Sequence, residues 1–189
     1  MSEARRKFTR SLYGFDAVMK RVPEDRWSNP SPCPGWTARE VAGHMIFGTW
    51  MMAAATGVGE IPSGSEADVA GDDPMAAWTA ALDAVLDGLD RPDVLDQEAE
   101  TPFGRMPIGR FAAVFSVEPL IHTWDLAAAA GVDPVLDVGL CERGIRQIEK
   151  AGDLVRGPGM YGDPVEVADS ADVATRFIAF TGRDPAWSA

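Results

Sequence analysis

The chain has 189 residues, of which 46% are hydrophobic and 24% charged, as is typical of globular proteins. This composition excludes disordered, collagen-like and disulfide-framework classes. With 17 Lys and Arg against 29 Asp and Glu, the net charge of −12 argues against nucleic acid and against an anionic membrane surface as partners. We therefore expect a single domain over residues 1–189, with a core bundle at about 5–131 and a helical extension at about 132–189.

The first two predicted helices follow from apolar spacing and from one capping signal. Apolar residues recur every three or four positions over residues 5–20, which predicts an amphipathic helix. Thr37 and Glu40 form the S/T-x-x-E pattern of a capping box, so a second helix is expected to start there and to run to the glycines at 57–59. His44 falls on the apolar stripe of this second helix.

The middle of the chain predicts a loop, a third helix and a short connection. Residues 57–73 are polar, Gly-rich and acidic, which favours a surface loop. Asp73 followed by Pro74 is typical of a helix start, and the third helix should end at Arg91. Residues 98–108 alternate in polarity around a Phe-Gly pair, which fits either a small hairpin or a turn-rich connection.

The last part of the chain predicts one long helix and two shorter ones. The long helix should cover about 109–130 and end at Gly131, with Glu118, His122 and Asp125 on its inner stripe. Shorter helices are expected at 138–148 and 173–180, separated by a Gly/Pro-rich loop at 152–164. The predicted fold class is therefore all-α, a four-helix bundle with a short helical C-terminal extension.

The two histidines of the chain both fall on apolar stripes, and this points to a metal site. A polar side chain in a dry interior needs a partner, and Glu118 and His122 share one helix face because they are four residues apart. A divalent ion held by His44, Glu118 and His122 would satisfy all three groups and keep open positions for a ligand. Zinc is the first expectation, and nickel, iron or manganese also suit this donor set. Asp125 is expected to orient an imidazole from outside the ligand set, or else to be a fourth ligand.

Several alternatives stay open at this stage. The polar trio fits an ion-free hydrogen-bonded cluster as well as a metal site. Cys33 and Cys141 are expected to be reduced thiols; Cys33 could be a ligand or a redox nucleophile, but packing is the stronger expectation. Trp36 and Trp124 fit either pocket walls or core. Arg39, Arg110 and Arg183 are candidate anchors for a carboxylate or a thiol cofactor, and nothing in the sequence favours one of them.

Two segments carry a family resemblance. The segment PCPGWTAREVAGH at 32–44 and the segment EPLIHTWDLA at 118–127 resemble two signatures of the mycothiol-dependent maleylpyruvate isomerase N-terminal domain, in the DinB-like superfamily. The ending FTGRDP at 180–185 is similar to the tails of short actinobacterial members. The resemblance implies a DinB-like four-helix bundle that holds one divalent ion through His44, Glu118 and His122.

The function that this resemblance implies is use of a low-molecular-weight thiol such as mycothiol, in an isomerase or an S-transferase that acts on a small electrophile. The alternative is a non-catalytic module that binds or senses a metal or small ligand. Catalytic residues and the substrate stay unassigned.

We also expect a cytoplasmic protein, because residues 45–55, the longest apolar run, are too short to span a membrane and the start of the chain does not resemble a secretion signal. A homodimer is expected from exposed Trp and Met side chains on the first and third helices, and the family resemblance implies the same.

Two features depart from the family pattern. The characterised isomerase has an additional C-terminal domain that contributes to its active site, and we expect none in this chain. Pro119 directly follows Glu118, and a proline inside a helix frees the carbonyl four residues before it, here that of Phe115. We therefore expect the fourth helix to bend at this point, which would change the approach of Glu118 to an ion.

Overall fold

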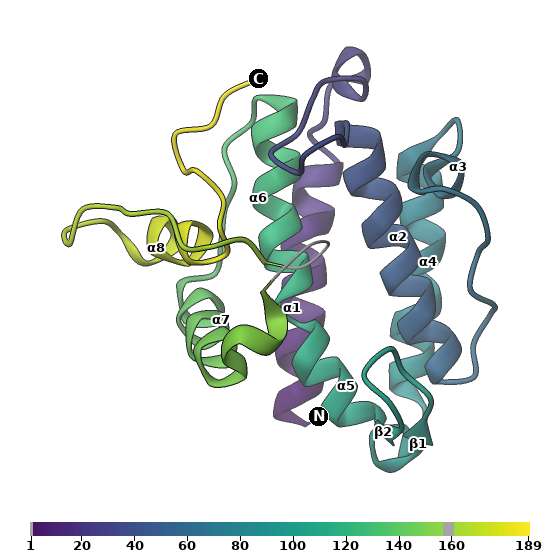
Figure 1. Ribbon diagram of the computed structural model, residues 1–189. Coiled ribbons are helices and arrows are strands. Elements are labelled where there is room, and N and C mark those ends of the chain that lie inside the picture. The colour runs from purple at the N-terminus through teal and green to yellow at the C-terminus, as the bar shows by residue number, and fades with distance from the viewer. Residues whose placement is uncertain (1, 157–160) are drawn as a thin grey trace.

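The computed structural model describes residues 2–156 and 161–189 and is helical over most of that length (Figure 1). Its helices are α1 (Glu3–Met19), α2 (Ala38–Ala55), α3 (Glu66–Ala70), α4 (Pro74–Asp90), α5 (Ile108–Phe115), α6 (Glu118–Ala130), α7 (Val138–Ala151) and α8 (Val173–Phe180). Short 3-10 turns lie at Glu24–Arg26, Val94–Asp96 and Gly152–Val155. The strands β1 (Glu98–Ala99) and β2 (Met106–Pro107) form a two-stranded antiparallel hairpin. The predicted all-α class and the hairpin before the fourth helix are confirmed.

Local signals in the sequence start two of the helices, and end a third, where they were expected. The backbone N–H and the hydroxyl of Thr37 both donate to Glu40 Oε2 at 2.7 Å, which completes the capping box of α2. Asp73 caps α4, with Pro74 at its first position. Gly131, with φ of 68°, ends α6 in the left-handed conformation that glycine adopts without strain.

The segment at 57–73, expected to be a loop, contains the helix α3, so that prediction was partly wrong. A capping box between Ser65 and Asp68 starts α3, and α3 packs closely on α2. The approach is so close that a Cβ atom added to Gly43 would lie 1.7 Å from the carbonyl oxygen of Glu66. A glycine on α2 therefore permits this helix to cover the bundle.

The single long helix expected at 109–130 is two helices, α5 and α6, which is a second correction. Pro119 has no N–H to donate to the carbonyl of Phe115, and its ring crowds that carbonyl. The chain responds by ending α5 at Phe115 and starting again: Leu120 and Ile121 both donate to the carbonyl of Val117, at 3.1 and 3.2 Å. Glu118 becomes the first residue of a new helix rather than an interior position of a long one.

The bundle pairs α2 with α4 and α1 with α6, and α2 also packs against α6 (Figure 1). Its core is one continuous apolar cluster; the largest fully buried side chains include Trp78, Phe8, Phe15 and Phe111. The extension is built around a second cluster, in which α7 and α8 pack against the opposite face of α6 (Figure 1). Side chains of α6 thus contribute to both clusters, and nearly every residue of this helix is buried.

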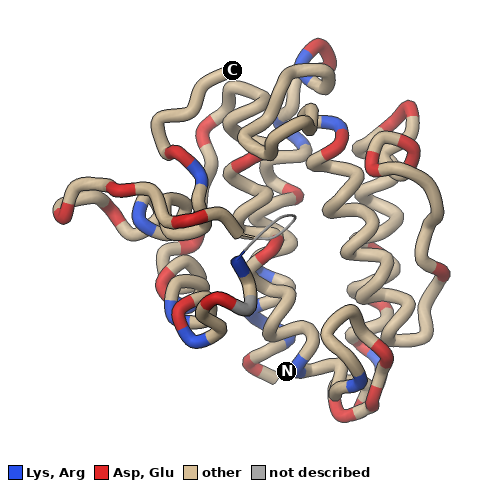
Figure 2. The backbone as a smooth tube through the Cα atoms, in the orientation of Figure 1, with Lys and Arg blue, Asp and Glu red and all other residues tan. Residues whose placement is uncertain are grey.

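The surface carries the charge that the composition predicts. Figure 2 shows Lys and Arg scattered among more numerous Asp and Glu. Within the described residues, no helix combines the length and the hydropathy that crossing a membrane would demand.

Cys33 and Cys141 are both free and buried. Of the Trp and Met side chains on which the expected homodimer was based, Trp78 is 0% exposed, Met19 is 2% exposed and Met75 is partly buried, and the homodimer stays a prediction. Residues 157–160 of the predicted 152–164 loop lie outside the described residues.

Candidate metal centre

The structure brings together the three residues that the sequence singled out as ligands. His44 comes from α2, and Glu118 and His122 come from successive turns of α6. One nitrogen of each imidazole and one carboxylate oxygen all lie within 4.8 Å of one another. The two imidazole rings meet edge to face, with centroids 4.8 Å apart. Two helices that are distant in the chain therefore present the donor set expected of an open metal site.

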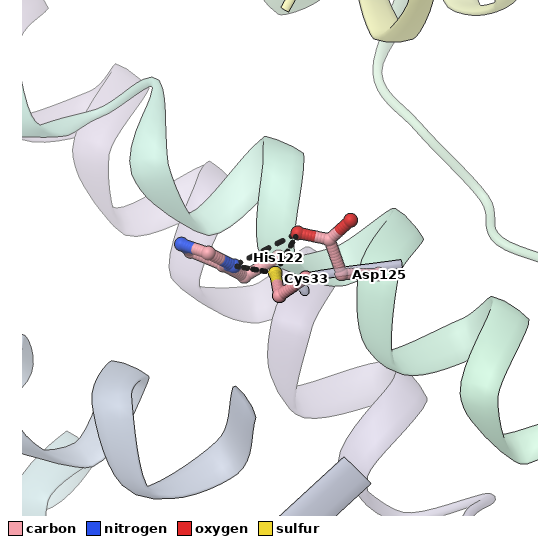
Figure 3. Close-up of side chains that lie close together, drawn as sticks. All are labelled: Cys33, His122 and Asp125. Carbon is pink, nitrogen blue, oxygen red and sulfur yellow. Dashed lines mark hydrogen bonds and ion pairs between the residues drawn. The ribbon is translucent and has the colours of Figure 1, made fainter. Parts of the chain in front are cut away.

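His122 is held at both ring nitrogens. Its Nδ1 lies 3.0 Å from Asp125 Oδ2, and its Nε2 lies 3.5 Å from Glu118 Oε2. Figure 3 shows Nδ1 turned toward Asp125 and Cys33, while the other ring nitrogen points to the opposite side. Burial alone would lower the pKa of His122, but the hydrogen bonds to Asp125, Cys33 and Glu118 outweigh it and raise that pKa well above its ordinary value. The Asp125 contact fixes which nitrogen faces Glu118.

Glu118 is held by a residue that the sequence analysis did not identify. The hydroxyl of Tyr161 donates to Glu118 Oε1 at 2.7 Å. Burial would raise the pKa of Glu118, yet the bonds from His122 and Tyr161 lower it to about 2, so the carboxylate is ionised. Burial and the neighbouring carboxylate raise the pKa of Tyr161, which therefore stays a donor. Tyr161 stands in a loop without periodicity, and no sequence signal marked it.

Asp125, which is fully buried, is the centre of a second group of contacts. Arg183 donates to it from Nε at 3.2 Å and from Nη2 at 3.0 Å, and the thiol of Cys33 donates to Oδ2 at 3.1 Å. Arg183 Nη2 also lies 3.7 Å from Cys33 Sγ. Of the three arginines named as candidate anchors, Arg183 is the one that reaches this group; Arg39 donates to the carbonyl of Gly71 and Arg110 is exposed.

His44 differs from the other members of the set. Burial, together with the charge of His122, lowers its pKa to about 4, so the ring is neutral near pH 7. Its contacts within residues 2–156 and 161–189 are with rings: the indole of Trp36 at 4.9 Å and the imidazole of His122 at 4.8 Å between centroids. A neutral imidazole whose nitrogen faces a carboxylate and a second imidazole has its lone pair ready for a cation. Trp36 is half-buried beside this site, whereas Trp124 belongs to the second apolar cluster.

Two donor sets share His122, and electrostatics makes one of them the better candidate. Besides the trio, Cys33, His122 and Asp125 lie close enough together to hold an ion. In that second set, however, the guanidinium of Arg183 already neutralises Asp125 and touches Cys33, so an added cation would face a fixed positive charge. In the trio of His44, Glu118 and His122, the positive charge beside Glu118 is the proton of His122 itself, which a bound ion would displace.

Comparisons with known proteins agree with this architecture. A family model described as the mycothiol maleylpyruvate isomerase N-terminal domain matches residues 8–127. The chain is 28% identical over 178 residues to the uncharacterized protein Rv0738 of Mycobacterium tuberculosis (strain ATCC 25618 / H37Rv), covering 92% of this chain and 94% of that protein. It is 28% identical over 135 residues to the uncharacterized protein Rv0036c of the same strain, covering 62% of this chain and 52% of that protein. No solved structure gives a significant match.

Proposed function

Because the chain belongs to the family of the mycothiol maleylpyruvate isomerase N-terminal domain, in the DinB-like superfamily, we propose that it binds a divalent ion and activates a low-molecular-weight thiol. His44, Glu118 and His122 would hold the ion, with zinc as the first candidate. Asp125 would orient His122 from outside the ligand set. The reaction that we propose is thiol-dependent isomerisation or S-transfer on a small electrophile.

The observation that carries this proposal is the convergence of the trio, and above all the state of His44. An ion-free hydrogen-bonded cluster would account for Glu118, His122 and Asp125, since His122 contacts both carboxylates. His44 is the additional member: its neutral, partly buried ring has a nitrogen that faces the same point, and no hydrogen bond from the described residues is made to it. A cation would give His44, Glu118 and His122 one common partner.

Charge supports a thiolate as the incoming group. Without an ion, two carboxylates, Glu118 and Asp125, face two positive groups, the guanidinium of Arg183 and the protonated ring of His122, whose pKa is raised. An ion held by the His122 nitrogen would displace the His122 proton, so the side chains would then carry one negative charge in excess. A divalent ion bound there would supply a Lewis acid that favours the thiolate form of a thiol at neutral pH. The sum would then be one positive charge, which an anionic thiolate neutralises. The protein's own side chains keep Glu118 ionised and hold the His122 ring in a fixed orientation. Apolar side chains around the site would strengthen the attraction between the ion and a thiolate, because they lower the local dielectric constant.

Elemental analysis of purified protein tests the site. We expect about one zinc per chain in the unaltered protein and its loss in His44→Ala and His122→Ala, while Glu142→Gln, an exposed change on α7, keeps it. Circular dichroism of each variant checks that the helices are intact. Metal content that is the same in the histidine variants contradicts the assignment. A melting temperature that does not respond to a strong chelator supports the ion-free cluster instead.

A conjugation assay separates an enzyme from a binding module. Incubation of the zinc-loaded protein with mycothiol and monochlorobimane should give the S-conjugate faster than the reagents alone, and His122→Ala should abolish this acceleration. Stoichiometric zinc without acceleration would favour a module that binds or senses a metal or small ligand. Screening of further electrophiles then distinguishes S-transfer from isomerisation.

A further inference from the structure

Two side chains outside the matched family segment contact the candidate centre. The family match ends at residue 127, whereas Tyr161 bonds Glu118 and Arg183 bonds Asp125. Both residues belong to the C-terminal extension. The segment that the family model matches therefore contains the candidate ligands, and a different part of the chain contacts two carboxylates, Glu118 and Asp125.

We propose that Tyr161 and Arg183 are positioning residues that make the centre competent to bind an ion, so that the C-terminal extension is a functional part of the site. The inference rests on the proposed metal site. It adds that the ligand trio alone, without the contacts from the extension, binds an ion weakly. Contacts of this kind, which orient ligands without touching the metal, typically change metal affinity by about 10- to 100-fold.

Tyr161 selects the oxygen that Glu118 presents. As the first residue of α6, Glu118 stands where the helix restarts, and its side chain keeps 26% of its surface exposed, so the carboxylate has a side open to solvent. The Tyr161 hydroxyl engages Oε1 at 2.7 Å and leaves Oε2 on the side of His122 Nε2, 3.5 Å away. Loss of the hydroxyl frees the carboxylate to rotate toward solvent, and its orientation would have to be fixed again on binding.

Arg183 fixes the orientation of the Asp125 carboxylate and, through it, the orientation of the His122 ring. Its two N–H groups reach both oxygens of Asp125, which fixes the plane of this fully buried carboxylate. Oδ2 of the same carboxylate lies 3.0 Å from His122 Nδ1. The guanidinium of Arg183 therefore orients the imidazole indirectly, through Asp125. Lysine, which offers one point charge instead of a planar fork, would replace the charge but not the orientation.

The two positioning residues belong to one folded unit. The backbone N–H of Gly162 donates to the carbonyl of Thr181 at 3.2 Å, and Val165 donates to Ala179 at 2.9 Å, so the segment after Tyr161 runs beside the segment before Arg183. This unit packs on α6 through α7 and α8. Docking of the extension therefore delivers both contacts together.

Metal affinity tests the inference without an activity assay. Competition with a chromophoric chelator gives the Zn²⁺ affinity of the full chain and of Tyr161→Phe, Arg183→Met and Arg183→Lys. We expect Tyr161→Phe and Arg183→Met to weaken Zn²⁺ binding by about 10- to 100-fold, with Arg183→Lys recovering only part of the loss. Tyr13→Phe, at an exposed position of α1, and Arg176→Met, at an exposed position of α8, are matched controls that should leave the affinity unchanged.

The visible spectrum of the Co²⁺-loaded protein separates positioning from a structural role. At saturating Co²⁺, Tyr161→Phe should change the position or intensity of the ligand-field bands, because one ligand is oriented differently; a change in stability alone would not alter them. Affinities within twofold of the unaltered protein for Tyr161→Phe and both Arg183 variants would overturn the inference while leaving the metal site standing. If the unaltered chain binds no metal, the proposed site and this inference both fall. Should Arg183→Met fail to fold, Tyr161→Phe and Arg183→Lys decide the matter.

Discussion

Replacing Asp125 by Asn should destabilise the protein strongly, because it removes the charge that compensates a largely buried arginine. Asp125 is 0% exposed and Arg183 is 15% exposed, and they are joined by two hydrogen bonds. Removing one partner of a buried ion pair costs about 3–5 kcal/mol, since the other charge stays buried without a counter-charge. Arg183 keeps some contact with water, so we expect the lower end, about 3 kcal/mol. For a chain of this length, about 2–4 °C per kcal/mol gives a fall in melting temperature of about 6–12 °C.

Urea unfolding followed by circular dichroism measures this change. The protein should be kept metal-free with a chelator, because a bound ion would add its own binding free energy to the folded state. The double variant Asp125→Asn/Arg183→Met should lose at least about 1 kcal/mol less than the sum of the two single variants, since each single change leaves a different group unpaired. The reasoning from burial would be refuted if Asp125→Asn lowered the free energy of unfolding by less than about 1 kcal/mol. It would also be refuted if the losses of the two single variants simply added up in the double variant.

Two further predictions concern packing and thiol chemistry. Gly43→Ala should destabilise the protein by about 3 kcal/mol because its Cβ would meet the backbone of Glu66, whereas Gly14→Ala, with a 3.9 Å contact to a side chain, should stabilise it by about 0.5–1 kcal/mol. Equal effects in urea unfolding would contradict the packing of α3 on α2. Burial raises the pKa of Cys141 from 9.0 to about 12, so at pH 8 its thiolate is about a thousandfold scarcer than in the unfolded chain. Mass spectrometry should find iodoacetamide alkylation at Cys141 slowed at least that much by folding, and similar rates with and without urea would contradict it.

The convergence of the three candidate ligands could be predicted because each residue lies on an apolar helix stripe. Polar side chains are rare there, so His44, Glu118 and His122 stood out before any contact was known, and the structure brings them together. The start of α2 at Thr37 and of α4 at Asp73 could be predicted because capping is a local interaction within one turn.

The rest depended on interactions that a local pattern does not contain. Tyr161 and Arg183 reach the centre from loops, where no periodicity shows which way a side chain faces. Pro119 signals a disturbed helix, but whether the axis bends or the helix ends depends on how the neighbouring helices pack. The capping pattern of Ser65 and Asp68 was present in the sequence, yet the surrounding glycines and acidic residues favoured a loop, and contact with α2 stabilises the short helix.

The burial of α6 on all sides also bears on how this scaffold changes during evolution. Residues of α6 pack either against the bundle or against the extension, so almost any replacement in it perturbs one of two cores. The helix that carries Glu118 and His122 therefore has little freedom to accept substitutions. New chemistry would arise more readily in the segments that face it, namely the loop that bears Cys33 and the C-terminal extension.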